Sequence, residues 1–157
     1  MIEIHLTRAI RRFLTKVCEE YLLETAKNGN RKPKIVNGYL PPKRAGADDD
    51  VPFILVRAES ASADESAISV DVSIVIGIFS KQDDGDVVGH DIVLEIISRI
   101  RTALMRLPNQ ILENRYMLDM PIEWDNVADQ PYPNWQMAMT THWVMPNPRP
   151  WSDGHEW

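Results

Sequence analysis

Alternating branched aliphatic residues between positions 67 and 79 constrain the fold more than any other feature of the chain. Every second position there is isoleucine or valine: Ile68, Val70, Val72, Ile74, Ile76 and Ile78. Successive side chains of a β-strand point to opposite faces, so these six share one face. The other face begins polar and ends apolar at Val75 and Phe79. The pattern predicts a central strand whose second face is covered at one end.

A helix is expected soon after this strand, beyond the acidic turn at positions 81–86. Its apolar residues recur at helical spacing: Val88, Ile92, Ile96, Ile100, Leu104 and Leu107. Asp84 or Asp86 can cap the start of this helix, and Pro108 is expected to end it. The two elements predict a sheet strand packed against a helix.

The remaining periodicities predict one more helix and four more strands. The helix is expected over 2–27 and the strands over 34–39, 53–61, 116–124 and 135–143. The strand over 53–61 should pair with the central strand as an antiparallel hairpin. Pro121 lacks a backbone donor, which predicts an edge position or a bulge.

The resulting order α-β-β-β-α-β-β predicts an α+β fold, in which a mostly antiparallel or mixed sheet is packed by two main helices in two layers. The length of 157 residues suits a single domain, which we expect to span 1–146. A C-terminal tail, 147–157, follows and contains prolines and tryptophans. Its Trp151 and Trp157 are either anchors for a partner or contacts with the chain's own domain.

Charge and cysteine content exclude several classes of function. A formal charge of −6 does not favour non-specific DNA binding, which needs lysine and arginine to displace counterions. The single cysteine, Cys18, excludes an internal disulfide and a cysteine metal cage, and its apolar neighbours predict a buried structural thiol. The sequence shows no signal peptide and no run of about 20 apolar residues, so we expect no membrane contact and a reduced, cytoplasmic protein.

Patterns typical of catalytic and metal sites are missing from the sequence. The acidic clusters at 48–50 and 83–86 lack the spacing of a calcium loop. No histidine lies in a zinc-binding pattern; the four are His5, His90, His142 and His155. Neither a nucleophile elbow nor a glycine-rich phosphate loop occurs. We therefore expect no catalytic residue, no metal and no cofactor.

Several segments together resemble a known family. They are the strand opening Val51-Pro52-Phe53-Ile54-Leu55-Val56-Arg57, the strand ending Ile74-Val75-Ile76-Gly77-Ile78-Phe79, the turn Asp84-Gly85-Asp86, and the motif Pro131-Tyr132-Pro133-Asn134-Trp135 before the last strand. In this layout the chain resembles the tail terminator, or tail completion, proteins of long-tailed bacteriophages and prophages, and is similar to the lambda-type minor tail protein U group. The resemblance covers about residues 1–146.

The resemblance implies a structural protein rather than an enzyme. Proteins of this family assemble as a hexameric ring on the tail tube, halt its polymerisation and offer a surface to the head–tail connector. DNA would pass through such a ring without specific binding, which an acidic wall favours. The expected location is the host cytoplasm during assembly and then the virion tail.

A ring needs two different patches that meet on neighbouring subunits. We expect one patch at Val75 and Phe79 with the acidic turn, and the other at the basic residues of the first helix or of the loop before position 51. Residues expected at these contacts are Asp83, Asp84, Asp86, Lys43, Arg44, Arg8, Arg11 and Arg12, with Trp151 from the tail. The segments 43–50 and 82–86 are expected to be the softest internal ones.

Two other functions remain open. The layout also suits another phage neck or connector protein, which the sequence does not separate from a terminator. A small-molecule-binding α+β domain or enzyme that uses the acidic loops is the alternative from a different class.

Overall fold

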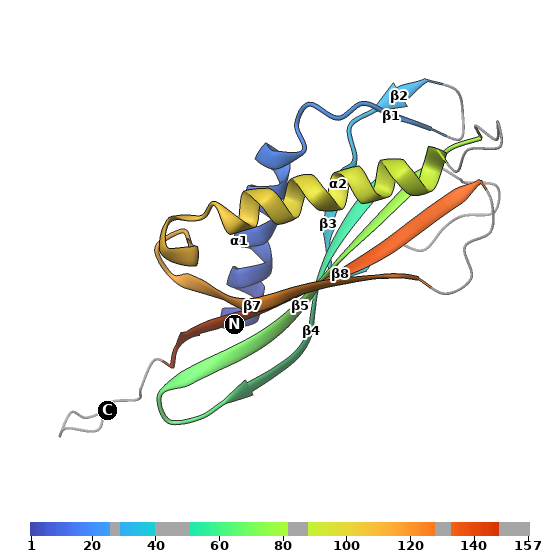
Figure 1. Cartoon of the computed structure of the whole chain (residues 1–157). Helices are drawn as coiled ribbons and strands as arrows, with labels where there is room; N and C mark the ends of the chain where they lie inside the picture. The colour runs from blue at the N-terminus through green and yellow to red at the C-terminus, as the bar shows by residue number, and fades with distance from the viewer. Residues whose placement is uncertain (26–28, 40–50, 82–87, 128–132, 148–157) are drawn as a thin grey trace.

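A six-stranded sheet with two helices on one face makes up the protein in the computed structural model (Figure 1). The structure describes residues 1–25, 29–39, 51–81, 88–127 and 133–147. The helices are α1 (Ile2–Val17) and α2 (Val88–Met105), with a short 3-10 turn η1 (Pro108–Gln110) after α2. The strands of the sheet are β3 (Lys34–Asn37), β4 (Phe53–Ala63), β5 (Ala67–Phe79), β6 (Ile111–Leu112), β7 (Tyr116–Asn126) and β8 (Asn134–Pro146).

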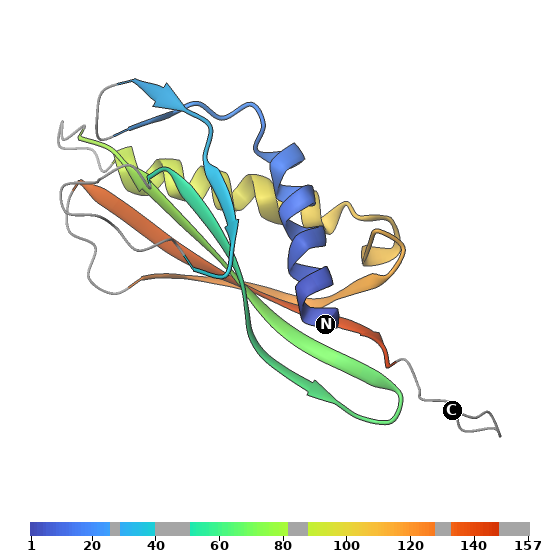
Figure 2. The same cartoon turned by 180° about the vertical axis from the view of Figure 1, so that it is seen from behind.

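The strand order is β3-β4-β5-β8-β7-β6. β3 runs parallel to β4, and every other neighbouring pair is antiparallel. The expected hairpin of β4 with β5 is confirmed, and its far end extends beyond the helices (Figures 1 and 2). The predicted α+β class, with a mostly antiparallel sheet, is therefore correct.

The alternating face of β5 forms the centre of the core. Val70, Val72, Ile74, Ile76 and Ile78 are at most 1 % exposed, while Ile68 is partly buried. α2 packs on this face along β5 and β8, and α1 packs on it along β3 and β4. The two helices cross one another over the sheet (Figure 2). Burial of apolar side chains from α1, α2 and the sheet holds the two layers together.

Trp143 is the largest fully buried side chain of the described core. Its indole Nε1 donates a hydrogen bond to the Thr141 hydroxyl, 2.8 Å away, and that hydroxyl donates to the carbonyl of Val72, 2.9 Å away. The polar atoms of Trp143 and Thr141 are thus satisfied inside the core. Cys18 is 2 % exposed, and burial raises its pKa to about 11, which fits the expected structural thiol.

The predicted first helix, 2–27, is wrong at its end, because α1 stops at Val17. The backbone leaves the helix at Cys18, where φ is −104° and ψ is 11°. Leu23–Glu24 then forms a short strand, β1, that pairs with β2 (Asn30–Arg31) in a separate two-stranded sheet. Leu22, which lies between α1 and β1, is 63 % exposed. Leu23–Glu24 therefore pairs with β2 in place of the helix that the sequence pattern predicted for this segment.

β7 is both bulged and next to the edge, as Pro121 predicted. Two extra residues lie between Asp119, which pairs with His142, and Glu123, which pairs with Thr140. The segment between α2 and β7 contains η1 and the two-residue strand β6, with Asn109 in the left-handed region at a φ of 55°.

We predict that Ile74→Ala lowers the free energy of unfolding by roughly 2–5 kcal/mol, the usual cost of deleting a buried aliphatic side chain. Ile74 is fully buried between the helices and the sheet. Chemical denaturation monitored by circular dichroism measures the loss. Ser69→Ala, at an exposed position of the same strand, is the control and should change stability by less than about 0.5 kcal/mol. A similar small loss for Ile74→Ala would contradict the packing described.

Candidate functional site

The outer edge of β7 is open along most of its length. β6 pairs only with Tyr116 and Met117. From Leu118 to Asn126, no other strand of the described ranges pairs with β7 except β8 on its inner side. An edge of this kind presents backbone groups that can pair with another chain.

Exposed apolar side chains accompany this open edge. Met117, Met120 and Trp124 are 45 %, 39 % and 41 % exposed. Beyond the two-residue bulge at Pro121, Trp124 still pairs with the buried Met139. The guanidinium carbon of Arg101 on α2 lies 5.8 Å from its ring centre, so Trp124 stays on the helix side of the sheet although it is partly exposed. Apolar residues grouped on an edge strand indicate a contact surface for another chain.

The two edges of the sheet carry opposite charge. β7 holds the exposed acids Asp119, Glu123 and Asp125, and its sequence 116–126 contains no lysine or arginine. At the other edge, the segment 30–37 that ends in β3 contains Arg31, Lys32 and Lys34 and no acidic residue. We name these the acidic edge (116–126) and the basic edge (30–37). Their charges are complementary across the full width of the sheet.

The basic edge also offers an aromatic ring. Tyr39 is 73 % exposed, and the guanidinium carbon of Arg57 lies 4.0 Å from the centre of its ring. Arg57 is held by a hydrogen bond from its Nε to the carbonyl of Gly38, 3.1 Å away. β3 pairs only with Phe53–Val56, so the outer edge of β4 from 58 to 63 has no partner strand among the described residues.

A row of polar side chains crosses the sheet face opposite the helices, here called the open face. The Nδ1 of His142 on β8 lies 2.6 Å from the Asp71 carboxylate on β5, and its Nε2 lies 3.4 Å from the Glu123 carboxylate on β7. Ser60 on β4 donates to the other oxygen of Asp71 at 3.1 Å. Side chains of four adjacent strands are thereby joined.

These contacts shift two pKa values. The hydrogen bond that His142 donates to Asp71 is the main cause that raises the pKa of His142, with Glu123 adding to it. The hydrogen bond from His142 is likewise the main cause that lowers the pKa of Asp71. The row therefore favours a protonated histidine between two carboxylates.

The row is not arranged for nucleophilic catalysis. Activation of a serine needs the hydroxyl within reach of the histidine, which acts as the base. Here Asp71 stands between Ser60 and His142 and binds both. Within the described ranges, no group of three or more His, Cys, Asp or Glu residues has a geometry that could hold a metal ion. The arrangement can join strands and carry charge.

The apolar end of the open face is largely covered by the chain's own side chains. The Phe53 ring lies directly over Gly77, which pairs with it across the sheet and leaves room because it has no Cβ. Phe79 is 8 % exposed, and the Nζ of Lys81 lies 5.5 Å from its ring centre. Val75 is half-buried. Of the two residues expected at a contact here, Phe79 thus offers little surface.

Several expected contact residues lie outside the described residues, namely Asp83, Asp84, Asp86, Lys43, Arg44 and Trp151. The expected soft segments 43–50 and 82–86 also lie outside them. Arg8 and Arg11 are exposed on α1, whereas Arg12 forms an ion pair with Glu113 at 2.7 Å.

The sequence analysis did not identify the opposite charges of the two edges of the sheet. A signal was present, since three acids without a base in 116–126 and three bases without an acid in 30–37 are visible in the sequence. The strand order was needed to place the two segments on opposite edges.

Comparisons with known proteins identify no relative. No protein-family model matches the chain, and a search of curated proteins finds no significantly similar sequence. In the described part of the chain, neither helix is long and apolar enough to cross a membrane.

We predict that His142→Gln destabilises the protein more at about pH 6 than at about pH 9. A histidine whose pKa is raised on folding contributes stability that is complete below its ordinary pKa of 6.5 and is lost as the pH rises through the raised value. The contribution should stay below about 1 kcal/mol, because the pair is partly exposed. Thermal unfolding of both proteins across this pH range measures it, and a difference that is constant with pH would contradict the charged pair.

Proposed function

We propose that the protein is a structural phage-tail assembly protein, which forms an oligomeric ring through the two edges of its sheet and caps the tail tube. The observation that carries this proposal is that the acidic edge and the basic edge have opposite charge, and that most of the outer side of each has no partner strand among the described residues. The resemblance of the sequence to tail terminator proteins supports the phage tail as the location of the protein.

Contact between unlike edges is heterologous. Such contacts close into a ring when the rotation between subunits allows it. The acidic edge of one subunit would meet the basic edge of the next, with the exposed side chains of Met120, Trp124 and Tyr39 buried between them. Complementary charge sets register and encounter rate, while the buried aromatic and methionine side chains supply the binding energy.

The open face suits the wall of a channel for DNA. Asp71 and Glu123 are 45 % and 61 % exposed on it, and Glu59, Asp119 and Asp125 are exposed near them. A wall that is rich in carboxylates repels phosphates and lets DNA pass without adhering. The helix layer would then face outward in the ring.

The partners of this ring are a second copy of the chain on each side, the tail tube below and the head–tail connector above. A hexamer is the stoichiometry that the family resemblance implies. Another neck or connector protein would use the same edges, so the position of the protein in the particle distinguishes the two functions.

We predict that reversing charge on the acidic edge prevents ring formation and capping. The variant Asp119→Lys with Asp125→Lys should stay folded but lose assembly, because two lysines would then oppose the basic edge. Light scattering measures the oligomer, and electron microscopy of tails measures their length distribution. Adding Lys32→Glu and Lys34→Glu to the same chain should restore both.

The matched control is Glu19→Lys with Asp91→Lys, which makes the same change in net charge at exposed positions of the helix layer. It should assemble normally. Tails of normal, uniform length with the edge variant would remove the edges from the contact, and failure of the unaltered protein to associate with tails would overturn the terminator function.

A further inference from the structure

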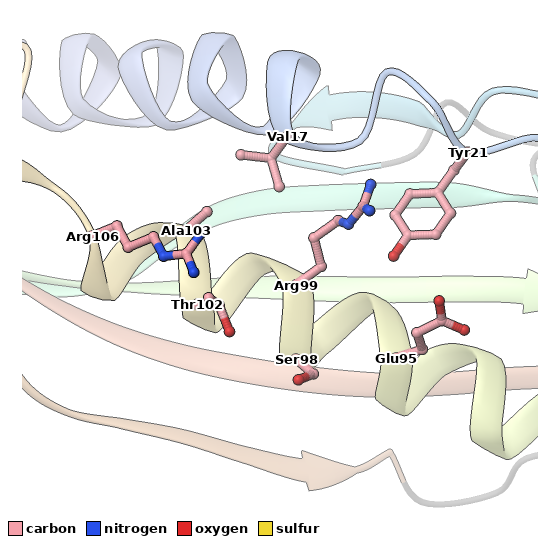
Figure 3. Close-up of a pocket in the computed structure, with 8 residues that line it drawn as sticks. All are labelled: Val17, Tyr21, Glu95, Ser98, Arg99, Thr102, Ala103 and Arg106. Atoms are coloured by element: carbon pink, nitrogen blue, oxygen red, sulfur yellow. The ribbon is translucent and has the colours of Figure 1, made fainter.

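A pocket between the two helices shares no lining residue with the acidic edge or the basic edge. It has a volume of about 470 Å³ and opens between the C-terminal end of α1 and the outer side of α2 (Figure 3). Its apolar part consists of Val17, Ala103 and the ring of Tyr21, and its polar part includes Arg99 and Arg106. The pocket combines an aromatic surface with two cations and one carboxylate, that of Glu95.

The two arginines are weakly engaged in the described structure. Arg99 stacks on Tyr21 at 5.0 Å and pairs with Glu20 at 3.7 Å, but Glu20 is 78 % exposed, so that ion pair is well solvated. Arg106 has no side-chain partner among the described residues, and Figure 3 shows it turned toward the pocket beside Ala103. Seven residues separate the two arginines, which is about 10.5 Å along a helix.

Tyr21 adds a hydroxyl without a hydrogen-bond partner among the described residues. Its hydroxyl is buried and has no hydrogen-bond partner in the described part of the structure. Burial is the main cause that raises its pKa, so the hydroxyl keeps its proton and can donate. A buried donor without an acceptor is costly, which favours a ligand that brings one.

The ligand that fits is therefore a peptide with an aromatic side chain and two carboxylates about 10 Å apart. The chain contains such a segment in 148–157, with Trp151, Asp153, Glu156 and Trp157. Three residues separate the two acids. In a polyproline II conformation, residues three apart share a face and lie about 9.3 Å apart. That spacing matches the separation of Arg99 and Arg106.

We propose that the pocket between α1 and α2 binds the segment 148–157 of a second copy of the chain. Asp153 pairs with Arg99 and accepts a hydrogen bond from the Tyr21 hydroxyl, and Glu156 pairs with Arg106. Trp151 packs on the apolar surface of Val17 and Tyr21. The contact is a clasp between copies, separate from the two edges of the sheet.

The length of the chain after β8 disfavours binding of the segment 148–157 to the pocket of its own chain. β8 ends beyond the N-terminal end of α1, whereas the pocket lies at the other end of that helix (Figures 1 and 2). α1 has 16 residues and is about 24 Å long. Asp153 is six residues past Asn147, the last described residue, and six extended residues span at most about 21 Å. The backbone up to Asp153 is thus shorter than α1, which favours the pocket of a second copy over the pocket of the same chain.

A binding experiment tests the pocket without any assembly. The recipient is the full chain with Trp151→Ala, Asp153→Lys and Glu156→Lys, whose own segment does not compete. A fluorescent peptide of sequence 147–157 is titrated with it, and anisotropy reports binding. We expect saturable binding that weakens at least tenfold when Arg106→Glu is added, and no change when Arg8→Glu is added instead. Absence of binding, or equal binding with Arg106→Glu, would overturn the proposal.

A mixing experiment tests whether the contact joins two copies. One full-length variant carries Arg106→Glu and so lacks the pocket, and the other is the recipient above and lacks the segment. Their mixture still holds one intact pocket and one intact segment. Both variants keep the edges of the sheet, so contact through the edges is the same in every sample. Chemical cross-linking should therefore give more heterodimer in the mixture than homodimer of either variant alone. Absence of heterodimers would exclude a clasp between copies.

The two experiments use the isolated protein, so their outcome is independent of tail capping. Loss of peptide binding with normal tails overturns the clasp alone, and peptide binding without any capping overturns the proposed function alone.

Discussion

Packing of both helices against one face of the sheet is the interaction on which the rest of the structure depends. The alternating isoleucine and valine side chains between 68 and 78 lie at the centre of that face, where α2 packs along β5 and β8 and α1 packs along β3 and β4. Because the two helices share one face, the opposite face of the sheet stays open to polar groups. The two outer edges of the sheet also remain available, since the helices pack on its face. Every candidate contact described above is a consequence of this one-sided arrangement.

The open face shows how a sheet keeps its shape where no helix supports it. His142 joins Asp71 and Glu123, and Ser60 extends the row to β4. At the other end of the same face, Phe53 covers Gly77, so apolar contact replaces the polar row. Charge and packing thus divide the open face into two regions, of which the charged one is next to the acidic edge.

The elements with strong periodicity could be predicted from the sequence. The alternation of β5 and the stripe of α2 from Val88 to Leu104 each identify a single secondary structure, and Pro121 correctly marked a bulge near an edge. The end of α1 could not be predicted, because pairing of Leu23–Glu24 with β2 is a tertiary effect. The polar row and the charged edges depend on strand order, which brings residues 71 and 142 together and which local patterns do not encode. The same holds for the pocket, where Tyr21 and Arg99 meet only when the helices cross.

Amide hydrogen exchange at low and high protein concentration, and with tail tubes added, tests the central claim most directly. If unlike edges meet, amides in 118–126 of β7 and in 30–37 should become protected on association, because open backbone groups gain partners or lose contact with water. Amides in the centre of α2 should exchange at an unchanged rate. Unchanged exchange at both edges in a sample shown to be oligomeric would contradict the account and place the contact elsewhere.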